Sequence, residues 1–383
     1  MKNKAKHSIV FIIAVAILAA GFSYFLNWRY QNRYSMKQPT VAAENKSSHG
    51  YQKVMDSNAA YQNVDRYLKQ QHFNGNITIY HKGKLVMDQS YGYQDFEAMK
   101  PTSPNSMYLI GSAQKFTTGL MLKKLEVEGK VNINDPIDKY LPWFKTSKPL
   151  ILKDIMLHRS GLKKFNGSPT AHSIEDVAKE LQQADIQPGM YKKHLYSDGN
   201  YIVLAAVIQS ITKEPFAKYF NETLRKPYDL RRTAFYNEKN YESDMAKGYN
   251  VKRELQQMKF LDQYYGAGNL FMSSRDMAKL VVNLQENKIF SPAITQKMLE
   301  EVKTNDYPST YRYGFYSYGA GNRINGMFYG HQMTSYFNKE YVVVMGTNYQ
   351  YPRYVNEKLL TEIFTKDLHQ PNPTKLLDKK PSI

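Results

Sequence analysis

A serine placed three residues ahead of a lysine is the feature of this sequence whose chemistry is easiest to name. Ser112 and Lys115 lie in the segment 108–130, "YLIGSAQKFTTGLMLKKLEVEGK", where an apolar helical pattern begins. Residues three apart share one side of a helix, so the amine can reach the hydroxyl. A hydroxyl with an adjacent base can act as the nucleophile of an acyl-transfer reaction.

The same four-residue pattern occurs twice more, in settings that favour a structural role. In 160–163, "SGLK", a glycine of the kind that ends helices separates the serine from the lysine. In 210–213, "SITK", the lysine falls in the last turn of an apolar helix, where cations are common. We interpret both segments as structural, and likewise His158 in "LHRSGL", which lies at a helix end.

The helix that follows Ser112 is apolar nearly all round its first turns, which predicts that it is buried. Its N-terminus then offers unpaired N–H groups to a carbonyl oxygen. Burial disfavours the charged form of an amine, so we expect Lys115 to accept the serine proton near neutral pH. The alternative is that Ser112 only caps the helix and that Lys115 extends its amine into solvent.

A phenol and a carboxylate precede a second apolar helix. Tyr196 and Asp198 lie in "KKHLYSDGNYIVLAAVIQSIT", directly before the helical pattern. Taken alone, this segment is typical of a turn followed by a helix N-cap. Together with Ser112 and Lys115, the two side chains can serve as a proton relay.

The elements that must position these residues are strands at both ends of the chain and helices between them. "NITIYHKGKLVM" alternates in polarity around a glycine turn and predicts a hairpin, and "RYGFYSYG", "MFYGHQMTSYFN" and "YVVVMGTNYQ" predict strands near the C-terminus. Helical patterns cover 64–71, 112–128, 151–158, 173–184, 199–213, 216–225 and 354–367. We therefore predict an α+β fold in which the two ends share one antiparallel sheet, flanked by helices and enclosing an inserted helical subdomain.

The N-terminus predicts export. Residues 1–7 contain three lysines, and 8–26, "SIVFIIAVAILAAGFSYFL", is uncharged and about as long as a bilayer-spanning helix. We interpret 1–7 as a cytoplasmic head, 8–26 as a transmembrane signal-anchor, 27–57 as a polar tether, 58–370 as the folded domain and 371–383 as a tail. The alternative is a signal peptide cleaved near 19–21, "AAG". Either way, the folded domain is expected on the outer, cell-wall side of the membrane.

The composition limits the classes of partner and cofactor that the protein is expected to bind. The formal net charge of +18, from 52 basic and 34 acidic residues, favours an anionic polymer or membrane surface. No zinc finger or RNA-binding signature accompanies it, so no nucleic-acid partner is expected. Cysteine is absent, which excludes thiol catalysis, and the nine histidines show no metal-binding spacing. No metal or other cofactor is implied.

Several segments, in this order along the chain, resemble the serine β-lactamase/penicillin-binding-protein superfamily, on the side of its class C enzymes and D-aminopeptidase-like esterases. They are "FNGNITIYHKGKLV", "MYLIGSAQKF", "NINDPIDKYLP", "LILKDIMLHRSGL", "YSDGNYIVLAAVI" and "YYGAGNLFMSSRDMAKLV". The resemblance implies a β-lactamase/transpeptidase-like fold with Ser112 as the acylated nucleophile, Lys115 as its general base and Tyr196 as a helper in proton transfer. "KYLPWFKTSKP", "LDQYYGAGNL" and "YRYGFY" look like a branch that removes D-alanine from teichoic acids of the cell wall.

Two departures from the superfamily pattern bear on the substrate. Asp198 stands where most members have asparagine, and the strand motif Lys-Thr-Gly or His-x-Gly is read here as 331–333, "HQM". His331 is the expected substrate-binding residue of that motif, but it carries charge only partially near pH 7. The N–H groups of Ser112 and Thr334 are expected to form the oxyanion hole. Recognition of a carboxylate, and so acylation by β-lactams, should be weak.

A D-alanyl ester presents a free ammonium and no carboxylate. Asp198 can pair with that ammonium or hold Lys115 in a useful orientation, and the sequence does not separate the two roles. Two other functions stay open. One is a penicillin-binding D-Ala-D-Ala carboxypeptidase, and the other is a membrane-tethered wall-binding protein that keeps the fold without catalysis.

Overall fold

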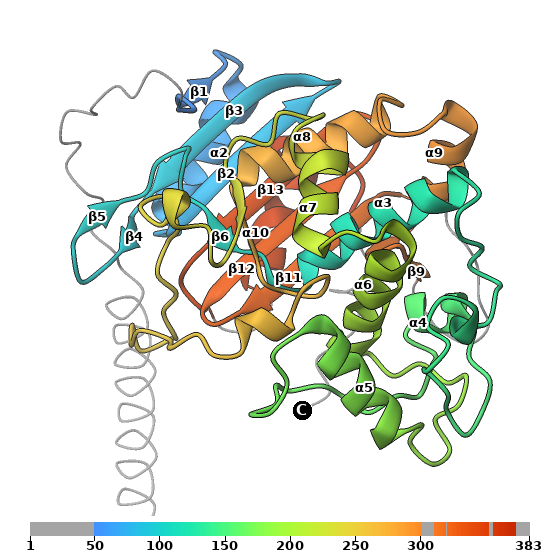
Figure 1. The fold of residues 1–383 in the computed structure, drawn as a ribbon. Coiled ribbons are helices and arrows are strands. Elements are labelled where there is room, and N and C mark those ends of the chain that lie inside the picture. The colour runs from blue at the N-terminus through green and yellow to red at the C-terminus, as the bar shows by residue number, and fades with distance from the viewer. Residues whose placement is uncertain (1–49, 301–309, 319, 352–354, 373–383) are drawn as a thin grey trace, which may run out of the picture.

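The computed structural model describes residues 50–300, 310–318, 320–351 and 355–372. A large antiparallel sheet lies on one side of the fold and a group of helices on the other (Figure 1). The predicted head, anchor and most of the tether and tail lie outside the described residues. Within the described ranges, no helix is both long enough and apolar enough to cross a bilayer.

The main sheet joins the two ends of the chain, as predicted. Its strand order is β1-β3-β2-β13-β12-β11-β10-β9, and every pair is antiparallel. The strands are β1 (Val54–Met55), β2 (Gly75–His81), β3 (Lys84–Tyr91), β9 (Thr310–Arg312), β10 (Phe315–Ser317), β11 (Asn322–Phe328), β12 (His331–Phe337) and β13 (Tyr341–Thr347). The β2–β3 hairpin turns at Lys82 and Gly83, both at positive φ, as tight hairpin turns require.

The folded domain begins earlier than the sequence predicts. Tyr51 donates a hydrogen bond to Asp276 Oδ1 at 2.6 Å and its N–H donates to Asn105 Oδ1 at 2.7 Å, while β1 pairs with β3. These residues fall within 27–57, the predicted tether. The last residues of that segment therefore belong to the fold, because their polar groups are satisfied by partners far along the chain.

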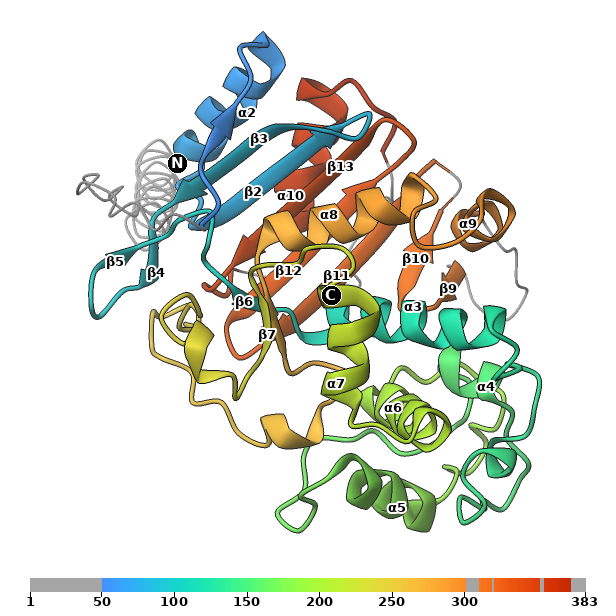
Figure 2. The same cartoon turned by 45° about the horizontal axis from the view of Figure 1, so that its top comes forward.

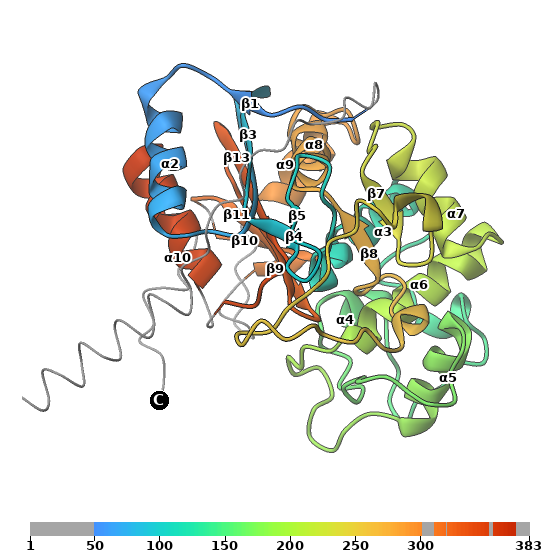
Figure 3. The same cartoon turned by 90° about the vertical axis from the view of Figure 1, so that its left-hand side faces the viewer.

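Helices cover both faces of the sheet (Figure 3). On one face lie α2 (Ala59–Gln70), α10 (Val355–Glu362) and the π-helical turn η6 (Ile363–Asp367), which contribute Val64, Leu68 and Leu360 to a fully buried cluster. On the other face α8 (Ser274–Gln285) lies across β2 and β13. Ser273 caps α8 by accepting a hydrogen bond from Asp276 N.

The helical region confirms the predicted insert. It contains α3 (Gln114–Val127), α4 (Leu152–Met156), α5 (Ile174–Ala184), α6 (Asp198–Thr212), α7 (Phe216–Phe220) and the π-helical turn η3 (Asn221–Arg225). Residues 199–208 of α6 are all buried, which explains why this helix is apolar over its whole length. Figure 2 shows α3 running between the sheet and α6.

Several short elements were not predicted. They are β4 (Tyr93–Asp95), β5 (Lys100–Pro101), a sheet of β6 (Tyr108–Leu109), β8 (Leu270–Met272) and β7 (Thr233–Phe235), the helix α9 (Pro292–Leu299), and the 3-10 turns η2 (Ile137–Lys139), η4 (Lys239–Tyr241) and η5 (Leu261–Gln263). The predicted helix 112–128 begins with another 3-10 turn, η1 (Gly111–Ala113), which runs into α3. Apart from α9, the unpredicted elements are segments of two or three residues, which are too short to show a hydrophobic period.

Helix α3 reaches the sheet by backbone contact. A Cβ added at Gly119 would lie 2.1 Å from the carbonyl oxygen of Tyr313, and one added at Gly314 would lie 2.0 Å from the carbonyl carbon of Lys115. The turn between β9 and β10 therefore fixes how closely α3 approaches the sheet. Phe116 and Phe315 pack edge to face beside this contact, with ring centroids 5.7 Å apart.

Gly119→Ala should destabilise the protein by about 1–3 kcal/mol, because the added methyl group meets backbone that cannot move aside. A glycine-to-alanine change inside a helix otherwise stabilises by about 0.5–1 kcal/mol. Chemical denaturation measures the difference. The control is Val127→Ala in the same helix, where the side chain is 50% exposed and little change is expected. A Gly119→Ala variant more stable than the parent would contradict this account of the contact.

Candidate active site

Ser112 lies at the point where a strand turns into a buried helix. β6 pairs with β8 and leads into η1, which contains Ser112 and runs directly into α3. Gln114 holds this turn in place, since its Oε1 accepts a hydrogen bond from Leu270 N at 3.1 Å. Gly111 adopts a φ of 52°, in the left-handed region that favours glycine. The serine is thus presented by backbone fixed on both sides.

Lys115 reaches Ser112 as the motif predicts. Its Nζ donates to Ser112 Oγ at 2.8 Å, to Asp198 Oδ1 at 2.5 Å and to the carbonyl oxygen of Ala267 at 3.2 Å. The side chain of Lys115 is fully buried. Neither η1 nor α3 has a side-chain cap, so the alternative of a capping serine and a solvent-exposed lysine does not hold.

Asp198 is brought to this pair by the start of α6. Ser197 caps the helix by accepting a hydrogen bond from Gly199 N at 3.2 Å, which fixes the first residue of the helix beside α3. Asp198 Oδ1 lies 3.5 Å from Ser112 Oγ as well as 2.5 Å from Lys115 Nζ. The carboxylate is 30% exposed, whereas the lysine is not exposed at all.

The charge state of Lys115 differs from the one expected from sequence. Burial strongly lowers the pKa of Lys115, but the negative charge of Asp198 and the interaction with Tyr196 together outweigh it and hold the pKa above its ordinary value. The sequence reveals that the amine is buried but not that a carboxylate lies beside it. In the free protein Lys115 is therefore an ammonium, and it must lose a proton before it can act as a base.

Tyr196 lies beside the lysine and is supported from behind by a histidine. Lys115 Nζ lies 5.1 Å from the centroid of the Tyr196 ring, and the ring of His158 lies 4.2 Å from the same ring. His158 is fully buried, and its Nδ1 lies 3.3 Å from Ser197 N. Burial lowers the pKa of His158, so its ring is neutral and structural, as predicted.

The other two serines are structural, as predicted. Ser160 Oγ donates to Asn200 Oδ1 at 2.6 Å inside the core, and Ser210 Oγ donates to the carbonyl oxygen of Tyr140 at 2.7 Å. Lys163 and Lys213, their partners in the motif, are exposed.

The strand that faces Ser112 is β11, one strand earlier in the chain than the sequence predicts. A Cβ added at Gly326 would lie 2.7 Å from the N atom of Ser112, so only glycine allows this approach. The strand motif of the superfamily therefore corresponds to 324–326, "ING", and not to 331–333. The glycine of that motif, which "HQM" lacks, is therefore present as Gly326, and the expected cation is replaced by the buried Ile324.

Thr334 does not face Ser112. It lies opposite Asn325 of β11 on one side and Met345 of β13 on the other, so its N–H is inside the sheet. Its hydroxyl donates to Asn325 Oδ1 at 2.8 Å. The expected oxyanion-hole role of Thr334 is therefore not supported. The signal that would have located the motif is the glycine of "RINGMF", within a strand pattern that begins a few residues after "YGFYSYG".

His331 does not reach a substrate either. Its side chain is fully buried, its ring packs edge to face on Phe271 with centroids 5.7 Å apart, and the backbone of Gly248 closes over it. Burial lowers the pKa of His331 to about 3, so the ring is neutral. The expected substrate-binding role of His331 is corrected to that of a core residue.

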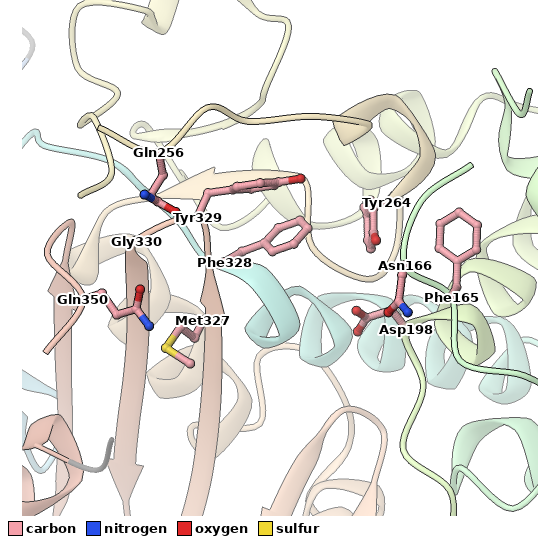
Figure 4. A pocket seen from close by; sticks show the side chains of 10 residues that line it. All are labelled: Phe165, Asn166, Asp198, Gln256, Tyr264, Met327, Phe328, Tyr329, Gly330 and Gln350. Carbon is pink, nitrogen blue, oxygen red and sulfur yellow. The ribbon is translucent and has the colours of Figure 1, made fainter. Parts of the chain in front are cut away.

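A pocket of about 380 Å³ opens beside Asp198 (Figure 4). Its lining is aromatic and amide-rich, with one carboxylate, and consists of Phe165, Asn166, Asp198, Gln256, Tyr264, Met327, Phe328, Tyr329, Gly330 and Gln350. Asp198 is the only one of these residues for which the sequence predicts a role in the site, because the others come from five separate loops and strand ends. Across the described residues, no group of three or more His, Cys, Asp or Glu side chains could hold a metal ion.

The buried His331 predicts part of the acid sensitivity of the fold. Its folded pKa of about 3 lies below the value near 6.5 of an exposed histidine, so its contribution to stability is complete above about pH 6.5 and is lost as the pH falls. Between pH 7 and pH 5 the loss should be about 2 kcal/mol. His331→Gln should remove that part of the pH dependence, as measured by denaturation at both values. His172→Gln, at an exposed site, is the control. Equal slopes for parent and His331→Gln would contradict the assignment.

Known proteins resemble this chain in sequence and in fold. A teichoic acid D-alanine hydrolase of Staphylococcus aureus is 48% identical over 316 residues, which cover 82% of this chain and 79% of that protein. The crystal structure of FmtA from Staphylococcus aureus superimposes with a TM-score of 0.80 at 44% identity, covering 93% of this chain and 99% of the other. An octameric penicillin-binding protein homologue from Pyrococcus abyssi shares the fold, with a TM-score of 0.69 at 21% identity over 83% of this chain and 78% of the other. The family model for Beta-lactamase matches residues 60–363, and the chain therefore belongs to the beta-lactamase family.

Proposed function

We propose that this protein is a serine esterase that removes D-alanine from teichoic acids of the cell wall through a D-alanyl-enzyme on Ser112. The observation that carries the proposal is the 2.8 Å contact between Lys115 Nζ and Ser112 Oγ, with Asp198 in reach of both. The substrate class is supported by the relative named teichoic acid D-alanine hydrolase, which is 48% identical.

Acylation begins once Lys115 is neutral. Its amine takes the proton of Ser112 while Oγ attacks the ester carbonyl, and the same proton is then given to the departing polymer hydroxyl. Tyr196 helps this transfer from its position beside Nζ. A water molecule, deprotonated by the same amine, hydrolyses the D-alanyl-enzyme and releases D-alanine.

The oxyanion that forms in both steps needs two donors. One is the N–H of Ser112, at the start of the buried helix. For the other we assign the N–H of Met327 on β11, whose N atom lies 3.0 Å from the position that a Cβ at Gly111 would take. This assignment replaces the one to Thr334, which lies one strand further from the serine.

An anionic polymer fits the surroundings of the pocket. Lys163 and Lys164 are exposed beside Phe165, and Lys259 is exposed where its carbonyl oxygen accepts a hydrogen bond from the Tyr329 hydroxyl. These cations, within a chain of net charge +18, would attract polyol-phosphate backbone. Acylation by β-lactams should be weak, because Ile324 offers no charge to the carboxylate of such a ligand.

The N-terminal segment supports a location at the cell membrane. We infer that residues 8–26 form a single-pass signal-anchor and that the hydrolase domain lies on the outer side, joined by the tether. A membrane-bound enzyme would then act on polymer within reach of the cell surface.

The proposal predicts release of D-alanine from purified teichoic acid by the parent protein. Ser112→Ala removes the nucleophile, and Lys115→Met removes the base while keeping the length and volume of the buried side chain. Each should lower the rate at least about a thousandfold, as loss of a nucleophile or its base does in other serine hydrolases. Free D-alanine, measured enzymatically, is the readout. Ser160→Ala is the control for serine removal, because that hydroxyl is structural.

Two outcomes would favour the other functions. Fast and stable labelling by penicillin at low concentration, without D-alanine release, points to a D-Ala-D-Ala carboxypeptidase. Polymer binding that is equal in the parent and in Ser112→Ala, again without D-alanine release, points to a wall-binding protein.

A further inference from the structure

Asp198 is placed to serve two cations. The hydrogen bonds that its side chain receives from Lys115 and Ser112 both use Oδ1. The residue also lines the pocket, where Figure 4 shows the carboxylate pointing into the cavity beside Tyr264 and Asn166. One side of the carboxylate is therefore committed to the buried lysine, and the other faces the space where an acyl group would lie.

The pocket around this carboxylate suits a small cation. Tyr264, Phe328 and Phe165 line it, and aromatic faces attract ammonium groups. Tyr264 and Phe328 pack together with ring centroids 4.9 Å apart, and Phe165 packs on Tyr264 at 5.4 Å. Burial and the negative charge of Asp198 raise the pKa of Tyr264, so this ring lies within the field of the carboxylate. None of the residues that line the pocket is a lysine or an arginine, so Lys115 is not joined by a second cation from the pocket wall.

We propose that Asp198 binds the free ammonium of an aminoacyl ester, and that this ammonium competes with Lys115 for the carboxylate and so converts Lys115 into a base. The inference rests on the proposed function, since a D-alanyl ester carries such an ammonium. It joins the two roles that the sequence left as alternatives. The same residue recognises the substrate and controls the proton affinity of the lysine.

The physical reason is the cost of burying Lys115. The ammonium is fully buried and is held charged by Asp198, because burial alone favours the neutral amine. A second cation at the carboxylate weakens that hold and adds repulsion between two like charges. Lys115 then releases one proton to solvent, and the neutral amine takes the proton of Ser112 as Oγ attacks. Atoms and charge balance, because the leaving hydroxyl receives that proton.

The consequence is selectivity for aminoacyl esters at the level of catalysis as well as binding. An ester without an ammonium leaves Lys115 paired with Asp198, so its hydrolysis requires a higher pH. The same holds for the second step, because the D-alanyl-enzyme still carries its ammonium beside Asp198.

The test compares two chromogenic esters of the same phenol, D-alanyl and isobutyryl, which differ in an ammonium for a methyl group. For the parent protein, the acid limb of the kcat–pH profile reports the base in the enzyme–substrate complex. That limb should lie at least about one pH unit lower for the D-alanyl ester, a tenfold difference in available base. In Asp198→Asn the two limbs should coincide, and the kcat/KM preference for the D-alanyl ester should fall at least about tenfold.

Asp138→Asn, an exposed substitution in η2 away from the pocket, should behave as the parent. Coincident limbs in the parent, or an unchanged D-alanyl preference in folded Asp198→Asn, would overturn the inference. If Asp198→Asn does not fold, the comparison in the parent still decides. Separated limbs without D-alanine release from teichoic acid would overturn the proposed function and leave this inference standing, whereas release with coincident limbs would do the reverse.

Discussion

A buried ammonium is the interaction on which the rest of this structure depends. Lys115 is fully buried, and a charge in such a place is stable only if oxygen atoms surround it. Asp198, Ser112 and the carbonyl oxygen of Ala267 supply them. These groups come from the start of α6, from η1 and from the loop before β8, so three separate parts of the chain must converge on one nitrogen atom.

Glycines make that convergence possible. Gly326 lets β11 approach the N atom of Ser112, and Gly119 and Gly314 let α3 meet the turn between β9 and β10. At each position a Cβ would overlap backbone, so the distance between helix and sheet is set by main chain alone. The serine and lysine are therefore held by contacts between backbone atoms, as a preorganised site requires.

The charges near the serine suit this beta-lactamase fold to the proposed aminoacyl ester, rather than to a β-lactam that carries a carboxylate. β11 offers the buried Ile324 where a cation would hold a substrate carboxylate, and Asp198 offers negative charge at the pocket. Both changes disfavour a carboxylate and favour an ammonium. The exposed lysines around the pocket would then attract the polymer backbone, so attraction of the polyanion and recognition of the acyl group are separated in space.

The features that depend on local pattern, namely the helices, the hairpin and the position of the nucleophile, could be predicted from the sequence. The long apolar runs that follow Ser112 and Asp198 located both helices, and the alternation around Gly83 located the hairpin. The order of the segments, with strands at both ends and helices between them, then predicted one sheet shared by the two ends. The Ser-x-x-Lys spacing located the nucleophile and its partner, since neighbours on one helical turn meet whatever the rest of the chain does.

The features that depend on contacts between distant segments could not be predicted from the sequence and are visible only in the tertiary structure. The strands β11 and β12 are adjacent, and which one faces Ser112 depends on how the sheet docks against α3. Because of that docking, the strand motif next to Ser112 contains Gly326, and His331 lies in the core. The fold also brings Asp198, 83 residues away in sequence, to within 2.5 Å of Lys115. The lysine is therefore an ammonium and not the neutral amine that the sequence predicts. Electrostatic energy depends on separation in space, which sequence spacing fixes only within a single helix or turn.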